Sequence, residues 1–270
     1  MSAKPFVKWV GGKRGIMKSL LTYTPTQINN YYEPFVGGGA LFFEIANRTK
    51  YSYLSDLNAD LITCYQIIKT KPLELIEALK THKENHCKDY YYATRSKQDL
   101  KCFVQNTARF IYLLATCFNG LYRVNKKNIF NAAFGYYKNP NILDEDNLKS
   151  VHQVLQNTTI THQDFSKINP TKGDFVYFDS PYHDSFLEYT KDKFTEKDQE
   201  RLRDFALNLS KNGINVMISN SNTKFIKDLY KNDFEIIEIT TSKSINPNHR
   251  KPSTELLIKN YDTFKASNSF

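Results

Sequence analysis

YYEPFVGGGALFFEIANRTKYSYLSD, residues 31–56, holds two β-prone runs separated by a glycine triplet and a helix-prone segment. The first run covers residues 31–35, the glycines are residues 37–39, the helix pattern covers 41–46, and the second run ends at Asp56. A strand, a turn, a helix and a strand in this order predict a β-α-β unit with parallel strands. Glycines at such a turn let the backbone approach a ligand, and the N-terminus of the next helix favours an anionic group.

The same alternation returns in the last third of the chain. Strand patterns cover residues 159–161, 175–178 and 214–218, and helix patterns cover 195–211 and 224–231. The first of these helices opens with a capping box, Thr195-Glu196-Lys197-Asp198. Two further strand patterns, at 234–240 and 255–258, have only a loop between them, which predicts an antiparallel hairpin closing a mostly parallel sheet.

The middle of the chain carries a different pattern. Between about residues 60 and 118, apolar residues recur at spacings of three and four, as at Leu73, Ile76 and Leu79, which predicts helices. Residues 119–137 then form a polar and aromatic stretch. We interpret the middle as a helical insert between two halves of one α/β domain.

Composition narrows the class of protein. The 270 residues include 37 Lys and Arg against 28 Asp and Glu, a formal net charge of +9, which favours an acidic partner such as nucleic acid. The 14% aromatic content favours a folded chain, and the length suffices for one large domain or two small ones. The four cysteines form no CxxC pair and no apolar run could span a bilayer, which argues against a zinc knuckle, a disulfide scaffold and a membrane protein. Since no signal-peptide pattern is present either, we expect a cytoplasmic protein with reduced thiols.

Two acidic residues follow predicted strands. Asp56 lies 17 residues after Gly39, where a carboxylate can accept hydrogen bonds from a ribose diol. Asp179 opens the tetrapeptide Asp179-Ser180-Pro181-Tyr182, directly after the strand at 175–178, and ligands bind at the carboxyl ends of parallel strands. A surface aspartate and a proline turn after a strand account for the same residues without any function, so the patterns alone leave both interpretations open.

Aromatic and basic residues near the N-terminus suggest a second ligand-binding segment. Trp9 is the only tryptophan and lies between Lys8 and Lys13 in a glycine-rich stretch. Its ring could stack on a nucleobase beside a cation for a carboxylate, although a lone tryptophan is most often part of the core.

Other polar residues of the middle segment also have two interpretations. His82 and His86 have the i, i+4 spacing of metal ligands, but the charged segment KTHKENHCK favours a solvated helix face. Arg95 and Arg123 lie in polar segments, and arginine is the bidentate reader of guanine. Surface solubility is the alternative role for both. A cysteine nucleophile has little support, because no cysteine follows a proline.

Taken together, these segments resemble the Dam-like DNA adenine-N6 methyltransferases of the α-ordered group. The resemblance runs nearly end to end and rests on the order and spacing of eight segments. In chain order they read KWVGGKRG, EPFVGGGALFFE, LSDLNADLI, FNGLYRVNKKNIFNAAFG, GDFVYFDSPY, KFTEKDQERL, MISNSNT and SINPNHR with ELLIKNY.

The resemblance implies a Rossmann-like catalytic domain formed by residues 1–58 and 145–270. A helical target-recognition domain would cover 59–144, with a DNA-reading hairpin at 119–137. The implied methyl donor is S-adenosylmethionine. By position, the residues that should serve this cofactor are Trp9, Lys13, Phe35, Gly37, Gly39, Asp56, Asp164, Phe165 and Asp179.

Within this set the resemblance implies separate roles. Trp9 and Phe165 would contact the adenine ring, Asp164 its amino group, Asp56 the ribose and Lys13 the methionine carboxylate. The residues at or near DNA-contact positions are Lys8, Arg95, Asn119, Arg123, Asn125, Lys127 and Tyr137.

The implied reaction is methylation of adenine N6 on a base flipped out of duplex DNA. Adenine N6 is a poor nucleophile because its lone pair is delocalised into the ring. The Asp179 carboxylate and the Ser180 carbonyl would accept its N–H bonds, Pro181 would fix the turn, and Tyr182 would stack on the base. Catalysis would rest on orientation and local electrostatics and needs no metal.

Two departures from the family pattern bear on activity and target. Ser180 stands where the family usually has proline, so the loop loses one fixed φ. The hairpin reads FNAAFG where FNVPFG is usual, so another short palindrome competes with GATC as the target. The remaining alternatives are cytosine-N4 methylation, which Asp179 disfavours, and a DNA- and cofactor-binding homologue impaired in catalysis. Duplex DNA is the expected partner, a restriction endonuclease is a further candidate, and neither a membrane nor a metal is expected.

Overall fold

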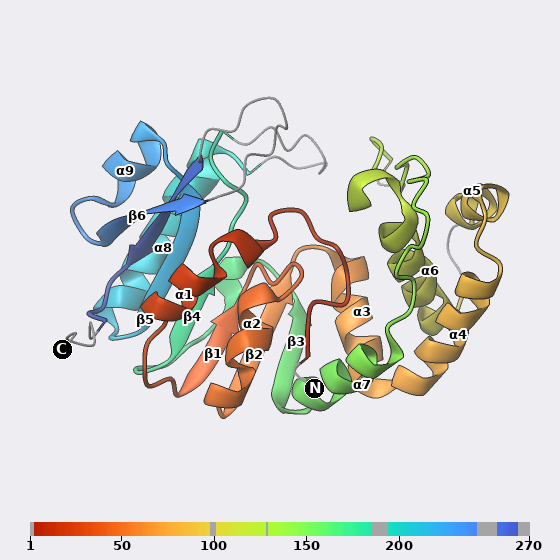
Figure 1. Ribbon diagram of the computed structural model, residues 1–270. Helices are drawn as coiled ribbons and strands as arrows, with labels where there is room; N and C mark the ends of the chain where they lie inside the picture. The colour runs from red at the N-terminus through yellow and green to blue at the C-terminus, as the bar shows by residue number, and fades with distance from the viewer. Residues whose placement is uncertain (1–2, 98–100, 128, 185–193, 242–252, 264–270) are drawn as a thin grey trace, which may run out of the picture.

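The architecture is a single seven-stranded sheet with helices on both faces and a helical region at one side (Figure 1). We describe a computed structural model of the chain, and the described residues are 3–97, 101–127, 129–184, 194–241 and 253–263. The SINPNHR segment, residues 244–250, lies outside these ranges. The strands are β1 (Asn30–Glu33), β2 (Tyr51–Asp56), β3 (Thr158–His162), β4 (Phe175–Phe178), β5 (Asn215–Ser221), β6 (Glu235–Thr241) and β7 (Ser253–Lys259).

The order of the strands is β3-β2-β1-β4-β5-β7-β6. Strands β1 to β5 are parallel, and β7 is antiparallel to both β5 and β6, which confirms the predicted α/β sheet and its closing hairpin. Some boundaries differ from the prediction: β5 ends at Ser221 and not at residue 218, and β1 ends at Glu33 and not at Phe35. The next residue is Pro34, which has no N–H to donate to the ladder.

The helices are α1 (Met17–Tyr23), α2 (Ala40–Ile45), α3 (Ala59–Thr70), α4 (Pro72–Glu84), α5 (Lys88–Ser96), α6 (Phe103–Thr116), α7 (Glu145–Val154), α8 (Glu196–Lys211) and α9 (Lys224–Tyr230). Short 3-10 turns occur at η1 (Lys13–Gly15), η2 (Ala46–Arg48), η3 (Phe118–Gly120), η4 (Leu155–Asn157) and η5 (Phe165–Lys167). The predicted capping box is present at the start of α8, where Thr195 and Asp198 bond each other's backbone N–H.

Alternation along the strands divides the core between the two faces of the sheet. On β4, Phe175 and Tyr177 belong to the cluster that includes α2 and α3, whereas Val176 and Phe178 belong to the cluster that includes α8 and α9. Successive side chains of a strand point to opposite faces, and a parallel sheet is buried on both. The continuous apolar run of β4 is the expected signature of such a strand.

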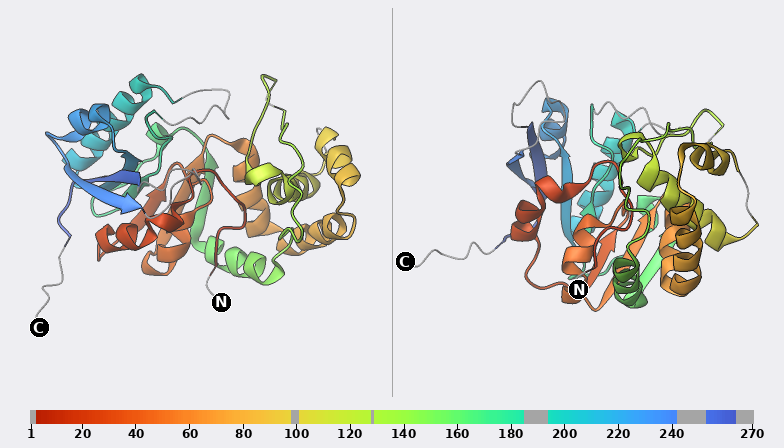
Figure 2. Two further views of the ribbon diagram at one scale, coloured as in Figure 1. Left: turned by 45° about the horizontal axis from the view of Figure 1, so that its top comes forward. Right: turned by 45° about the vertical axis from the view of Figure 1, so that its right-hand side comes forward.

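The middle segment is helical, as predicted. Helix α3 packs against β2 and β3 and also against α6, and a single apolar cluster joins the sheet to α4 and α6. Helices α4, α5 and α6 lie to one side of the sheet, beyond α3 (Figures 1 and 2). The domain boundary at residue 59 stays a prediction.

The stretch at 119–137 is an irregular hairpin. Two isolated antiparallel bridges hold it, one between Cys117 and Phe134 and one between Val124 and Phe130. A separate small core of Tyr91, Tyr112, Cys117 and neighbouring side chains lies beneath it. In Figure 1 this stretch lies at the same end of the molecule as the loop that follows β4.

The interpretation of His82 and His86 as a solvated face is wrong for His82, which is buried. Its ring stacks on Tyr112, and its Nδ1 bonds the Tyr90 hydroxyl at 2.8 Å. Burial lowers the pKa of His82 to about 4, so the ring is neutral. His86 Nδ1 bonds the Tyr112 hydroxyl at 3.0 Å. His82 thus helps to pack α4 against α5 and α6, and His86 packs the turn after α4 against α6.

Across the described ranges, no helix is long and apolar enough to cross a membrane.

Candidate cofactor and catalytic site

The centre of the site is the carboxylate of Asp179, one residue beyond β4. Its Oδ1 accepts a hydrogen bond from Ser219 Oγ at 2.7 Å and faces the Lys13 ammonium at 2.7 Å. The hydroxyl of Tyr177 lies 2.9 Å from Ser219 Oγ. The contacts of Asp179 with Ser219 and Lys13 both fall on Oδ1, so Oδ2 is the oxygen that is available to a ligand.

Lys13 is brought to this carboxylate by the glycine-rich N-terminal segment. The ammonium also donates to the Gly11 carbonyl at 2.7 Å and lies 4.6 Å from the centre of the Tyr182 ring. Only 6% of the residue is exposed, so the charge is largely removed from water. An ammonium has three N–H donors, and two are used here, which leaves one for a ligand carboxylate.

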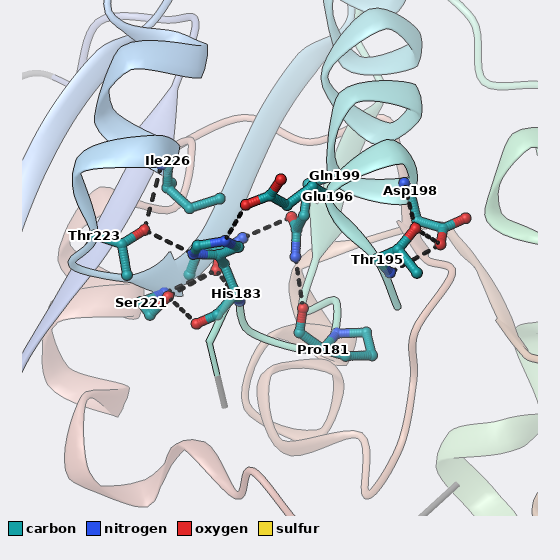
Figure 3. A network of polar contacts seen from close by, with 10 residues as sticks. Pro181, His183, Thr195, Glu196, Asp198, Gln199, Ser221, Thr223 and Ile226 are labelled. Carbon is teal, nitrogen blue, oxygen red and sulfur yellow. Dashed lines mark hydrogen bonds and ion pairs between the residues drawn. The ribbon is translucent and has the colours of Figure 1, made fainter. Parts of the chain in front are cut away.

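Two residues of the segment that follows Asp179 are held by side chains from other elements. The Tyr182 hydroxyl donates to Glu255 Oε2 at 2.6 Å, on β7. The Ser180 hydroxyl is buried and has no hydrogen-bond partner within the described ranges. The carbonyl of Pro181 accepts from Gln199 Nε2 at 2.9 Å, on α8 (Figure 3). The sequence brings these residues together because β4, β5 and β7 are neighbours in the sheet.

Asp56, the last residue of β2, bonds the backbone of the glycine turn through its carboxylate. Its Oδ2 accepts from the Gly37 N–H at 3.1 Å and its Oδ1 from the Asn58 N–H at 2.9 Å. Burial raises the pKa of Asp56, and these backbone donors oppose the rise. Each carboxylate oxygen keeps a further lone pair, so the side chain can still accept bonds from two hydroxyls.

The glycines of the turn are required by its geometry. Gly37 and Gly39 have φ of 48° and 66°, where other residues are strained. A Cβ on Gly37 would lie 2.8 Å from Trp9 Cδ1, and one on Gly39 would lie 2.7 Å from the Tyr65 hydroxyl. The Trp9 ring and the Tyr65 hydroxyl therefore pack directly against the backbone of the turn, where only glycine leaves room for them.

Trp9 is half-buried between the glycine turn and the helical segment. Its ring stacks on Tyr122 at 5.4 Å and 26° and lies 6.3 Å from Phe110. Through these contacts Trp9 packs the N-terminal segment, residues 8–15, against the predicted recognition segment. A contact between Trp9 and an adenine ring stays a prediction.

Asp164 and Phe165 follow β3 and contact Arg201, a partner that the sequence analysis did not predict. Arg201 of α8 donates to both carboxylate oxygens of Asp164, at 2.8 and 3.1 Å, and its guanidinium lies 4.2 Å from the Phe165 ring centre. Burial disfavours the charged carboxylate, but Arg201 and Ser166 prevail and lower the pKa of Asp164 to about 2. Phe165 is 1% exposed and stacks on Phe35 at 5.4 Å.

Five of the seven predicted DNA-contact residues, Asn119, Arg123, Asn125, Lys127 and Tyr137, lie in the irregular hairpin. Arg123 is exposed and donates from Nε and Nη2 to the side chain and carbonyl of Asn131, both at 2.9 Å. Asn125 Oδ1 instead organises the turn by accepting from the N–H groups of Lys127 and Ile129.

Three other predicted DNA contacts have different surroundings. Arg95 donates to the Ala132 carbonyl at 2.9 Å and lies over the Tyr92 ring, so it supports the hairpin from below. Asn119 is exposed with φ of 55°. Lys8 lies 4.5 Å from the ring centre of Tyr137, which ties the N-terminal segment to the end of the hairpin.

Sequence reasoning missed the residues that reach the site from other strands and helices. These are Glu33, Tyr177, Gln199, Arg201, Ser219, Asn220 and Glu255. Arg201 offered one signal, since arginine is much rarer than lysine here, but only the fold shows that α8 carries it to β3. Among the described residues, no three His, Cys, Asp or Glu side chains are grouped so that they could hold a metal ion.

The strand order, with five parallel strands and an antiparallel β7 beside β5, defines a Rossmann-like α/β domain. The family model of the D12 class N6 adenine-specific DNA methyltransferases matches residues 9–245, and the chain belongs to this family. A type II methyltransferase of Lactococcus lactis, M1.LlaDCHI, is 40% identical over 97% of this chain and 96% of its own. The DNA adenine methylase of Haemophilus influenzae is 33% identical over 94% of this chain and 92% of its own.

A solved structure, that of the 23S rRNA methyltransferase ErmE, aligns with 94% of this chain and 70% of its own at 9% identity and a TM-score of 0.44. The chain is an adenine-specific DNA methyltransferase, and its cofactor is S-adenosylmethionine. The residues present are compatible with such a group. The Asp56 carboxylate bonds the Gly37 N–H of the glycine turn, and the Lys13 ammonium, which pairs with Asp179, belongs to a residue that is 6% exposed.

Glu33 is a buried acid beneath this site. It is 2% exposed at the end of β1, and the Tyr31 hydroxyl donates to its Oε2 at 2.9 Å. Burial raises the pKa of Glu33 from 4.5 to about 8, and the Tyr31 hydroxyl opposes the rise. The side chain is therefore mostly protonated at neutral pH.

This protonation makes stability depend on pH. Between pH 4.5 and about 8 the folded chain keeps a proton on Glu33 that the unfolded chain releases, so the free energy of unfolding falls as pH rises through this window. Replacing Glu33 with Gln removes this dependence, and the variant should gain on the parent as pH rises from 4.5 to 8. Urea denaturation across the window measures the difference, with Glu44→Gln on the exposed face of α2 as the control. A difference that is constant with pH would contradict the assignment.

Proposed function

We propose that this protein methylates adenine N6 within a short palindromic site of duplex DNA, acting on a base flipped out of the helix. The observation that carries the proposal is the carboxylate of Asp179, fixed through Oδ1 by Ser219 and Lys13 at the carboxyl end of β4. The second oxygen and the neighbouring Ser180 carbonyl then supply the two acceptors that an exocyclic amino group requires.

The proposed chemistry uses this fixed geometry. With one N6–H bonded to Asp179 and the other to the Ser180 carbonyl, N6 is drawn from planar towards tetrahedral geometry and its lone pair is freed from the ring. Tyr182, held by Glu255, is the residue that we assign to stacking on the base. S-adenosylmethionine supplies an electrophilic methyl group when it is bound. Rate enhancement then comes from alignment and from charge placed before the reaction.

For the cofactor we assign the ribose to Asp56 and the carboxylate to the third N–H of Lys13. The backbone of Gly37 and Gly39 would line the path between them. The adenine would lie near Phe35, Phe165, Asp164 and Trp9. Since Arg201 occupies both oxygens of Asp164, an adenine amino group must share that carboxylate with the guanidinium.

For target recognition we assign Arg123 to guanine. Asn131 holds the guanidinium by its Nε and Nη2 edge, which leaves Nη1 and the outer N–H of Nη2 for a bidentate contact. GATC is the first candidate target. The names of the adenine methylase relatives support adenine and not the sequence around it, and the absence of the usual hairpin proline keeps another palindrome in contention.

We place the protein in the cytoplasm of a bacterial or phage-infected cell, where DNA is accessible to it. The relative named a type II methyltransferase favours a role beside a restriction endonuclease that acts separately. The rival function is a homologue that binds DNA and cofactor without transferring methyl groups, since Ser180 departs from the family pattern. Incubation with unmethylated DNA, followed by sequencing for N6-methyladenine, distinguishes the two and reads out the target.

Asp179→Ala should abolish methyl transfer and leave the fold intact, because the residue lies beyond the strand and not in the core. Loss of the carboxylate removes an acceptor for N6–H and the partner of Lys13. A methyl-transfer assay with purified protein, accompanied by circular dichroism, measures both properties. Turnover close to that of the parent would show that Asp179 is not the catalytic acceptor.

Ser180→Pro should preserve or raise turnover. The serine hydroxyl has no partner to lose, proline fixes φ, and the following Pro181 already favours an extended conformation at residue 180. We expect a gain in stability of about 0.4–1 kcal/mol. Single-turnover methylation at saturating DNA and cofactor tests this, with Ser180→Ala as the control for loss of the hydroxyl. A fall of tenfold or more in the proline variant alone would show that the loop needs the backbone N–H of residue 180.

Arg123→Ala and Lys127→Ala should affect DNA binding in different ways. The arginine change should remove about 1–3 kcal/mol of discrimination at one base pair. The lysine change should weaken binding to every duplex and lower the salt dependence by about one ion. Titrations of specific and random duplexes at several salt concentrations separate the two effects. Identical behaviour of the two variants would contradict this division of roles.

A further inference from the structure

Strand β5 ends beside the segment that follows β4, residues 179–183, which we call the catalytic loop. Two consecutive polar side chains of β5 point to opposite faces of the sheet. Ser219 belongs to the face that holds Tyr177, and Asn220 to the face covered by α8. Both side chains are fully buried. Buried polar groups are costly unless they are bonded, so their partners indicate what they are for.

The first side chain fixes the catalytic carboxylate. Ser219 Oγ donates to Asp179 Oδ1, so the short contact with Tyr177 must be a bond that the Tyr177 hydroxyl donates to Ser219. Tyr177 is fully buried on β4, the strand next to β5. A chain of two hydrogen bonds, rooted in the core, therefore sets the rotation of the Asp179 carboxylate.

The second side chain fixes the backbone of the loop. Asn220 Oδ1 accepts from the His183 N–H at 3.0 Å, and its Nδ2 donates to Gln199 Oε1 at 3.0 Å. Gln199, also fully buried, in turn donates to the Pro181 carbonyl (Figure 3). The two amides thus hold the residues on either side of Tyr182.

Outer contacts hold His183 itself. Ser221 Oγ donates to its carbonyl at 2.6 Å, and the imidazole bonds Thr223 Oγ1 at 3.1 Å and Glu196 Oε1 at 3.2 Å (Figure 3). The ring also stacks on Phe225 at 4.7 Å. His183 therefore serves as a fixed end of the loop.

We propose that Ser219, Asn220, Gln199 and Tyr177 are positioning residues for methyl transfer. They act from both faces of the sheet on the carboxylate and backbone of the loop and do not touch the substrate. The proposal rests on the proposed function of Asp179 and Tyr182. It also explains how Ser180 is tolerated, since two side-chain amides restrain the loop that proline would otherwise stiffen.

Positioning predicts a particular kinetic signature. Ser219→Ala and Gln199→Met should each lower kcat, by as much as about 100-fold, because small misplacements of reacting groups have effects of this size. The KM for DNA and the dissociation constant of S-adenosylmethionine should change by less than about twofold, since neither ligand contacts these residues. Ser219→Thr, which keeps the hydroxyl, should restore most of the turnover.

Two matched controls separate position from general stability. Ser55 is a buried serine at the carboxyl end of β2 whose hydroxyl has no partner within the described part of the chain, so Ser55→Ala should leave turnover unchanged. Asn222 lies two residues after Asn220 and bonds Glu238 instead of the loop, so Asn222→Ala should also be neutral. If Gln199→Met does not fold, Gln199→Glu keeps an acceptor for Asn220 and removes the donor to Pro181, and the same fall in kcat is expected.

Hydrogen exchange provides a second measurement that does not depend on turnover. Hydrogen exchange of the peptide covering residues 181–184 should accelerate in Asn220→Ala, because the His183 N–H loses its acceptor, and in Gln199→Met, because Asn220 loses the partner that fixes it. It should stay unchanged in both controls. Unchanged exchange, or a raised KM with normal kcat, would overturn the proposal. A parent protein that transfers no methyl group to any DNA, while exchange still accelerates in the variants, would refute the proposed function and leave the positioning of the loop established.

Discussion

The pairing of β1 with β4 is the constraint on which the site depends. These strands come from chain halves separated by the whole helical segment, yet Tyr31 and Tyr32 pair in parallel with Phe175 and Val176. The carboxyl ends of the two strands therefore meet at one edge, where the glycine turn follows β1 and the segment from Asp179 to Tyr182 follows β4. Without that register, the N-terminal Lys13 would have no carboxylate at Asp179 to meet.

Much of this arrangement follows from local sequence. Continuous apolar runs give strands buried on both faces, a glycine triplet after a strand gives a tight turn, and aspartates at or after strand ends give acids at the carboxyl edge of the sheet. Each of these signals lies within a few neighbouring residues, so Asp56 and Asp179 are identifiable from the amino-acid sequence alone. The positive φ of Gly37 and Gly39 shows why the turn requires glycine at these two positions.

The supporting residues could not be found in this way, because their partners are distant in sequence. Gln199 reaches Pro181 across 18 residues, Ser219 reaches Asp179 across 40, and Arg201 reaches Asp164 across 37. Each looks like an ordinary helix or strand residue until the packing of α8 and β5 is known. The burial of His82 could not be predicted for the same reason. Its neighbours in the sequence are charged, whereas the aromatic ring that stacks on it, Tyr112, lies on α6.

The charge balance of the site follows from the same register. Glu33 and Asp179 end or follow adjacent strands, and the negative charge of Asp179 is one of the causes that raise the pKa of Glu33. If both acids were ionised, they would compete for the single ammonium of Lys13. Because burial raises the pKa of Glu33 to about 8, this acid carries little negative charge at neutral pH and competes little for Lys13, whose ammonium pairs with Asp179 instead. The burial of Glu33 at the end of β1 thus leaves the Lys13 ammonium to the carboxylate that follows β4.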